Sequence, residues 1–256
     1  ELGNTSLSFF DSVVVLIKAS AHQLERAPEL IANLEELRPA KETPNVIIGL
    51  SPKEQHEWAE DLKGRLYLDE TVSVAVTILD TGVNYHHPIL GEVCREQQAE
   101  RWHPDWPRYD EFNPTNPLAP FNDHGSRQAG LAVFGDLQAA LVSSDPIVLN
   151  HRIESARILP PAGNNDPELY GAITVGTVAK LEVEVPHYSR VYSLAVTAEP
   201  ERDGGQPSSW SAEIDQFSSG LEDGKQRLFV ISAGNNGNLS PSVDYWEQVH
   251  LAQIED

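Results

Sequence analysis

The sequence is poor in cysteine, in basic residues and in long apolar runs, and each shortage excludes a class of protein. A single cysteine, Cys94, cannot form an intramolecular disulfide, so the 256-residue chain is not a disulfide-stapled domain. Lysine and arginine number 18 against 39 aspartates and glutamates, and the net charge of −21 repels phosphate backbones. We therefore expect no nucleic-acid partner, and solubility is the simplest explanation of the acidity.

No apolar run approaches the ~18 residues that are needed to cross a bilayer. The opening ELGNTSLSFF also lacks the basic, apolar and small-residue order of a secretory signal. We therefore expect no membrane partner, and a cytoplasmic rather than a secreted location. An apolar content of 40% is enough for an ordinary hydrophobic core. The oligomeric state is not readable from these features.

The first part of the chain predicts a small α+β module over residues 1–70. The β-branched run at 12–19 predicts a strand. Ser20 and Gln23 have the spacing of a capping box at the start of a helix. A second helix is predicted for SPKEQHEWAEDLKG, residues 51–64, with serine as its cap and proline in its first turn.

From residue 71 to residue 256, apolar strand patterns alternate with helical ones, which predicts an α/β domain with a mostly parallel sheet. Helices are predicted after His124, from Asp166 and over SSWSAEIDQFSSG, and strands at 72–79, 155–160, 190–198 and 227–234. The segment from about 91 to 122 is rich in Pro, Trp and Asn and is expected to be a long irregular insertion. Its Trp102 and Trp106 are expected to pack against the body of the domain rather than to line a cleft.

The first predicted strand of this domain ends on a charge. VSVAVTILD is apolar on both faces until it reaches Asp80, and Thr81 and Gly82 then turn the chain. The carboxyl end of a parallel strand is where ligands and reactive groups gather. A buried carboxylate there is costly unless something hydrogen-bonds it. Asp80 therefore requires a partner.

Three motifs, in order along the chain, provide a candidate partner for Asp80 and together resemble a known family. They are ILDTGVN with Asp80, NDHGSRQAGLA with His124 at a helix start, and FVISAGNNG with Asn235 just past a strand. Together they resemble the subtilisin-like serine peptidases, and they imply a three-layer αβα fold. The resemblance implies that Asp80 orients the imidazole, that His124 is the general base and that Asn235 donates to the oxyanion. Gly125 is expected to allow a tight turn beside the imidazole, and Ala129 with Gly130 to allow close helix packing.

The resemblance also implies a substrate groove. YSLAV stands where the family has its substrate-binding strand, so Ser193, Leu194 and Ala195 are expected to pair with an extended peptide. Ala233 and Gly234 are expected to wall the pocket for the residue before the scissile bond. The N-terminal module resembles the family's propeptide domain in placement only. No cofactor is implied; structural calcium occurs in the family, but no ligand spacing can be named here.

The sequence departs from the family pattern in two places. HGSRQAG stands where HGTHVAG is usual, with Arg127 and Gln128 at positions that are normally histidine and apolar. No GTS-x-A nucleophile motif is present, and we expect the serine to lie beyond Asp256. These departures keep a second hypothesis open, a catalytically inactive subtilase-like module that binds peptides or regulates.

Two other classes of protein also contain a DTG sequence, so this motif alone does not decide the class. A DTG turn also begins the active-site loop of aspartic peptidases, but the α/β alternation does not suit that mostly β fold. A nucleotide-binding domain is disfavoured because no strand is followed by a G-x-G-x-x-G or P-loop sequence. The sequence therefore predicts a serine endopeptidase that acts on peptide or protein substrates.

Overall fold

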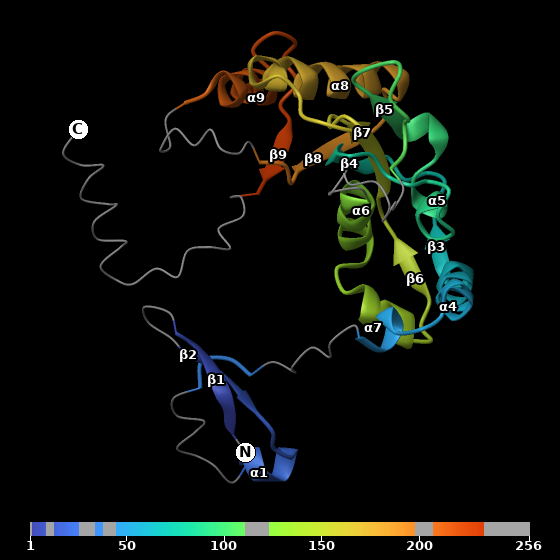
Figure 1. Ribbon diagram of the computed structural model, residues 1–256, viewed down its shortest axis with the longest axis vertical. Coiled ribbons are helices and arrows are strands. Elements are labelled where there is room, and N and C mark those ends of the chain that lie inside the picture. The colour runs from blue at the N-terminus through green and yellow to red at the C-terminus, as the bar shows by residue number, and fades with distance from the viewer. Residues whose placement is uncertain are drawn as a thin grey trace, which may run out of the picture. The chain divides into compact units, whose positions relative to one another are not determined.

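The computed structural model describes residues 2–8, 13–25, 34–37, 45–110, 123–197 and 207–232 (Figure 1). The chain divides into two compact units, residues 1–50 and 51–256. Among the described helices, none is both long and apolar enough to span a bilayer.

The first unit is built on an antiparallel pair, β1 (Leu2–Ser8) with β2 (Val13–Ile17). The short helices α1 (Ala21–Glu25) and α3 (Asn45–Ile48) follow. The strand predicted at 12–19 is β2, whereas β1 was not predicted. The capping box is confirmed, because the Ser20 amide donates to the Gln23 side chain at 2.9 Å and the Gln23 amide donates to Ser20 Oγ at 3.2 Å.

A five-stranded sheet forms the centre of the second unit, and all of its described strand pairs are parallel. The strands in spatial order are β5 (Ala99–Arg101), β7 (Arg152–Arg157), β4 (Val74–Asp80), β8 (Ser189–Leu194) and β9 (Leu228–Ile231). The chain begins at the centre in β4, builds β5 and β7 on one side, and then builds β8 and β9 on the other. The direction of winding therefore reverses at β4, and the carboxyl end of such a strand is the usual ligand site of an open α/β sheet.

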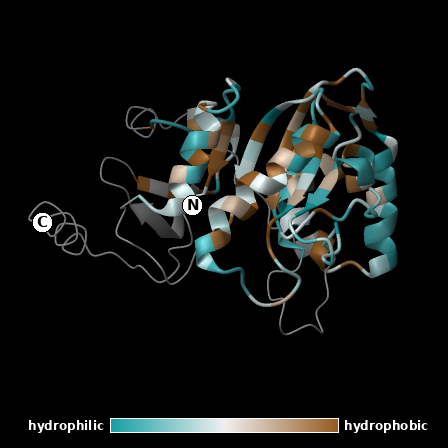
Figure 2. Ribbon diagram, turned by 90° about the horizontal axis from the view of Figure 1, so that it is seen from above, coloured by the Kyte–Doolittle hydropathy of each residue, from teal (hydrophilic) through white to brown (hydrophobic). Residues whose placement is uncertain are grey.

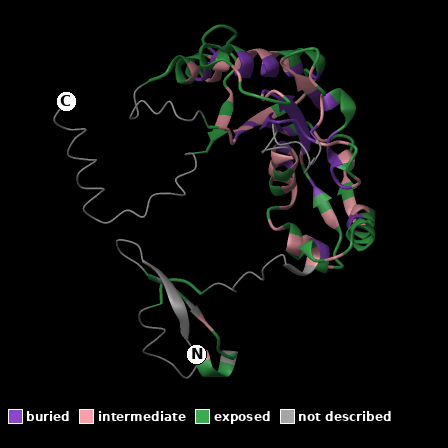
Figure 3. Ribbon diagram, viewed as in Figure 1, coloured by how far each residue is buried: buried purple, intermediate pink, exposed green. Residues whose placement is uncertain are grey.

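Helices cover both faces of the sheet, which confirms the three-layer α/β fold (Figures 1 and 2). On one face α8 (Tyr170–Glu184) and α9 (Ser209–Ser219) pack over a core that includes Leu79 and Tyr192. On the other face α5 (Leu90–Val93) and α6 (His124–Phe134) pack over Ile78 and Ile153. Figure 3 shows the buried residues concentrated on the central strands, and all six residues of β7 are buried.

A second, two-stranded sheet corrects the predicted domain boundary. In it β3 (Leu66–Leu68) pairs in parallel with β6 (Ile147–Leu149), and Leu66, Leu68 and Leu149 join the same core as α6. Helix α4 (Pro52–Gly64) precedes β3, and its capping box between Ser51 and Glu54 is confirmed. Residues 51–68 therefore belong to the second unit, not to the N-terminal module to which the sequence analysis assigned them.

The segment expected to be an irregular insertion is partly regular. It contains α5, a 3₁₀ turn at Glu96–Gln98 and the edge strand β5, while residues 111–122 lie outside the described residues. Trp102 packs against α8 as expected, since a Cβ added to Gly176 would come within 2.7 Å of its ring. The remaining elements are α7 (Leu137–Val142) and a 3₁₀ turn at Pro167–Leu169 before α8.

Candidate active site

Asp80 is the last residue of β4 and is fully buried at the point where the sheet reverses its winding. Its carboxylate has the partners that the sequence required. Oδ1 accepts from the Thr81 amide at 2.7 Å, and Oδ2 lies 2.7 Å from Nδ1 of His124. The negative charge is therefore held by hydrogen bonds rather than by water.

His124 is the first residue of α6, and its side chain is 36% exposed. An ionised carboxylate can only accept hydrogen bonds, so Nδ1 carries the proton towards Asp80 and Nε2 is unprotonated in the neutral ring. The hydrogen bond to Asp80 raises the pKa of the imidazole. Partial burial opposes that rise in pKa, and the charge of Asp80 adds to it. The pair thus consists of a buried hydrogen-bond acceptor, Asp80, and a partly exposed base, His124.

Two glycines bring α6 against the Asp80 turn. Gly82 has φ +102°, a left-handed conformation that favours glycine. A Cβ added to Gly125 would lie 2.2 Å from the carbonyl oxygen of Gly82, so only glycine fits at that contact. The Gly125 amide also donates to Thr81 Oγ1 at 3.0 Å. Gly125 is therefore needed for close approach of the backbone beside the imidazole; it is a helical residue without positive φ, so it does not form the tight turn that was predicted there.

The unusual residues of HGSRQAG lie mainly away from the Asp80–His124 contact. Ser126 accepts from the Asn84 amide at 2.8 Å, so it too joins α6 to the turn after β4. The Arg127 side chain is 69% exposed and pairs with Asp123 at 3.1 Å. Ala129 is buried as expected. The expectation for Gly130 was wrong, because a Cβ added there meets nothing within 4 Å and no close helix packing requires a glycine.

The predicted substrate strand needs a correction. Ser193 and Leu194 are inside the sheet, with β4 on one side and β9 on the other. The carbonyl of Leu194 already accepts from the Ser232 amide at 3.0 Å. A peptide therefore cannot pair with these two residues by strand addition, and only Ala195, beyond the end of β8, stays available for that role. The predicted Asn235, Ala233 and Gly234 lie outside the described residues.

Three residues that support this arrangement were not predicted from the sequence: Asp110, Asp123 and Arg157. Asp110 is buried, and its Oδ2 accepts at 2.5 Å from the backbone amide of Asp123, the residue immediately before His124. Arg157 is the register partner of Asp80 on β7, and its Nη1 donates to the Tyr109 carbonyl at 2.8 Å. In the sequence, Arg157 is only a charged residue within a predicted strand, and Asp123 only precedes a predicted helix. Charged residues are too common at such positions to be informative.

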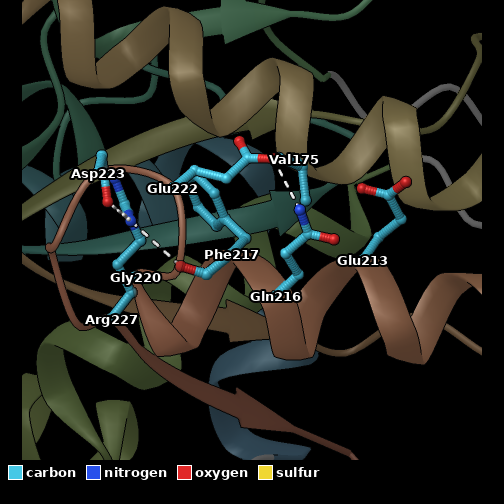
Figure 4. A pocket seen from close by; sticks show the side chains of 8 residues that line it. All are labelled: Val175, Glu213, Gln216, Phe217, Gly220, Glu222, Asp223 and Arg227. Atoms are coloured by element: carbon cyan, nitrogen blue, oxygen red, sulfur yellow. Dashed lines mark hydrogen bonds and ion pairs between the residues drawn. The ribbon is translucent and has the colours of Figure 1, made fainter.

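A small surface pocket lies between α8 and α9, which cover the opposite face of the sheet from α6 (Figure 4). Two of its charged residues, Arg227 and Asp223, pair with each other. Arg227 pairs with Glu182 of α8 at 2.7 Å and with Asp223 at 2.6 Å, and its guanidinium lies 3.9 Å from the centre of the Phe217 ring. These contacts tie α9 and the following turn to α8, which is a structural role.

A comparison with protein families gives a match to the subtilase family over residues 71–252. The chain belongs to the subtilase family. No curated protein and no solved structure matches it. Membership supports serine peptidase chemistry at the level of the family, with peptides or proteins as the substrates. In this subtilase, no cluster of three or more His, Cys, Asp or Glu side chains within the described ranges is arranged to hold a metal ion.

Proposed function

We propose that this subtilase chain supplies the Asp–His part of a serine endopeptidase, whose nucleophile is a serine C-terminal to residue 256. The observation that carries the proposal is the 2.7 Å contact between Asp80 Oδ2 and His124 Nδ1. A buried carboxylate that fixes one imidazole tautomer is the arrangement that prepares Nε2 to take a proton.

In the proposed reaction, the serine oxygen attacks the peptide carbonyl carbon while its proton moves to Nε2 of His124. The imidazolium then gives that proton to the leaving amine nitrogen as the peptide bond breaks. A water molecule repeats the two steps on the acyl-enzyme and releases the carboxyl product. The side-chain amide of Asn235 donates to the oxyanion, a contact that is worth roughly 10²–10³ in rate in enzymes that use it.

The role of Asp80 is to keep the imidazole in the productive tautomer and to stabilise the cation that forms. Replacing the corresponding aspartate by asparagine in an enzyme with this mechanism costs about 10⁴ in kcat. The raised pKa of His124 fits this role, because it reports a preference for the imidazolium beside Asp80.

For the substrate, we propose that an extended peptide lies past the end of β8, starting at Ala195, with Ala233 and Gly234 beside the residue that precedes the scissile bond. The position of Ala195 at the carboxyl edge of the sheet, the same edge as Asp80, supports this placement. We propose the cytoplasm as the compartment, because a chain with a single cysteine, Cys94, suits a reducing environment.

The alternative, an inactive binding module, was motivated by the altered HGSRQAG and by the absence of a nucleophile motif up to Asp256. Arg127 is exposed and paired with Asp123, and the Asp80–His124 contact stands beside it. Arg127 therefore offers no specific support for loss of catalysis, and the labelling experiment below tests for the serine directly.

Labelling of the full-length protein with a fluorescent fluorophosphonate tests the proposal, with the labelled peptide mapped by mass spectrometry. We expect label on a serine C-terminal to residue 256, and a loss of at least about 10³-fold in labelling rate for His124→Ala. His103→Ala is the matched control, because that imidazole is half exposed and contacts Asp105 and the Trp106 ring rather than Asp80. A folded parent protein that takes no label would contradict the proposal and favour the binding module.

A further inference from the structure

The segment that carries Asp110 packs directly on the turn after Asp80. A Cβ added to Gly82 would meet the backbone of Arg108, Tyr109 and Asp110 at 3.2–3.3 Å. Arg157, which is 3% exposed, holds the same segment by donating to the Tyr109 carbonyl at 2.8 Å. The position of Asp110 is therefore set by the sheet edge on which Asp80 lies.

Asp110 in turn contacts the residue before His124. Its Oδ2 accepts from the backbone amide of Asp123 at 2.5 Å, and the Asp110 side chain is buried. A hydrogen bond from an amide to an ionised carboxylate is roughly twice as strong as one between neutral groups. This contact joins two positions that are 13 residues apart in the chain.

Asp123 requires such a contact because its backbone is strained. With φ +72° it is the one residue other than glycine that has a positive φ in the described part of the chain. A left-handed conformation costs free energy for a residue other than glycine, and it persists where the surrounding structure enforces it. Asp123 is also the N-cap of α6, yet its side chain makes no capping hydrogen bond and pairs with Arg127 instead. At Asp123 the start of α6 is thus held from outside, by Asp110.

We propose that Asp110 is a positioning residue for His124: its buried carboxylate holds Asp123 in the left-handed conformation and so sets the first turn of α6 against the Asp80 turn. Asp110 acts through Asp123 and does not touch the reacting atoms. This inference rests on the proposed function for its effect on turnover, but its effect on the geometry of His124 is independent of turnover.

A double-mutant cycle between positions 110 and 123 tests the proposal, since glycine adopts the left-handed conformation without strain. Asp110→Ala in the full-length protein should lower kcat/KM on the order of 10- to 100-fold, as expected for a misplaced catalytic group. The same substitution in an Asp123→Gly background should have a much smaller effect, because that backbone no longer depends on the hydrogen bond. Asp105→Ala is the matched control, with an exposed carboxylate in the same segment.

The second readout is the pKa of the His124 imidazole, followed by NMR in all four proteins of the cycle. The ionisable groups that act on His124 are Asp80, Asp123 and Arg127, and the hydrogen bond to Asp80 is the largest influence. Asp110→Ala should move this pKa towards the ordinary histidine value if the imidazole loses Asp80. A direct charge effect of Asp110 would instead persist unchanged in the Asp123→Gly background and would overturn the proposal.

A substitute variant and a hydrogen-exchange measurement keep the role of Asp110 testable if Asp110→Ala does not fold or if the parent is inactive. If Asp110→Ala does not fold, Asp110→Asn replaces it in the cycle, and the weaker neutral acceptor should give a partial loss that Asp123→Gly again removes. In the parent, the Asp123 amide should be protected from hydrogen exchange, and a freely exchanging amide there overturns the inference. If the parent lacks peptidase activity, the proposed function fails while the pKa and exchange readouts still test the role of Asp110.

Discussion

Gly125→Ala is the substitution for which the structure gives the clearest expectation. The added Cβ would lie 2.2 Å from the carbonyl oxygen of Gly82, whereas carbon atoms at Cβ do not approach other heavy atoms closer than 3.0 Å. The start of α6 and the turn after Asp80 must therefore separate by at least 3.0 − 2.2 = 0.8 Å. Both partners are backbone, so no side-chain rotation relieves the contact.

Two magnitudes follow from that displacement. Overpacking of this kind costs about 1–3 kcal/mol of the free energy of unfolding. A shift of about 1 Å between catalytic groups costs on the order of 10²-fold in rate. The His124–Asp80 contact spans the same two segments, so we expect kcat/KM to fall about 10²-fold while most of the protein stays folded at 25 °C.

The assay is the rate of fluorophosphonate labelling of the full-length protein, with urea unfolding of the same samples. Gly130→Ala is the matched control, because it is the same change in the same helix and its Cβ meets nothing within 4 Å. It should keep the labelling rate and add roughly 0.5–1 kcal/mol of stability, as for glycine in a helix interior. Parental labelling by Gly125→Ala, or equal damage from both substitutions, would refute the reasoning.

The remaining predictions concern the pH dependence of activity and a buried ion pair. Since the pKa of His124 is raised and only neutral imidazole accepts a proton, kcat/KM should fall as the pH drops through a midpoint above the ordinary ~6.5. Asp80→Asn should lower that midpoint, and a parental midpoint at or below ~6.5 would exclude the hydrogen bond as the dominant influence on this pKa. Arg190→Ala should cost about 3–5 kcal/mol in urea unfolding, because it leaves the fully buried Glu154 charge uncompensated. Arg127→Ala, which removes an exposed pair, should cost less than about 1 kcal/mol, and similar losses in the two arginine variants would count against this ranking.

The sequence was most informative where one segment carries its own signal. The continuous apolar run predicted β4, and the serine cap predicted α4, because both signals depend on neighbouring residues alone. The Asp80–His124 contact was predicted from the resemblance of short motifs, although the two residues are 44 positions apart. Such motifs carry information that local propensity lacks.

Features that depend on distant partners were not predictable. The start of β7 was missed because Arg152 and Glu154 are polar, and they are buried only because ion pairs from other elements neutralise them. Strands β3 and β6 have three residues each, too few to show a period. The interior position of Leu194 depends on β9, more than thirty residues later in the chain.

Asp80 and Glu154 show how one physical problem can be solved for structure or for chemistry. Both are fully buried carboxylates on adjacent strands, β4 and β7. Glu154 is held by two hydrogen bonds from Arg190, at 2.7 and 2.9 Å, and by one from Thr77. Arginine keeps its proton at every physiological pH, so that pair can only stabilise the fold.

Asp80 is paired instead with an imidazole, which gains and loses its proton near neutral pH and is still 36% exposed. A proton that arrives on His124 is stabilised by the buried charge and can leave again through the exposed side of the ring. The capacity for acid–base chemistry therefore comes from the choice of a titratable, accessible partner, whereas the buried carboxylate by itself is common to both sites. This is why the arrangement around His124, including Asp110 and the glycine contact, is the part of the molecule whose displacement should change activity more than stability.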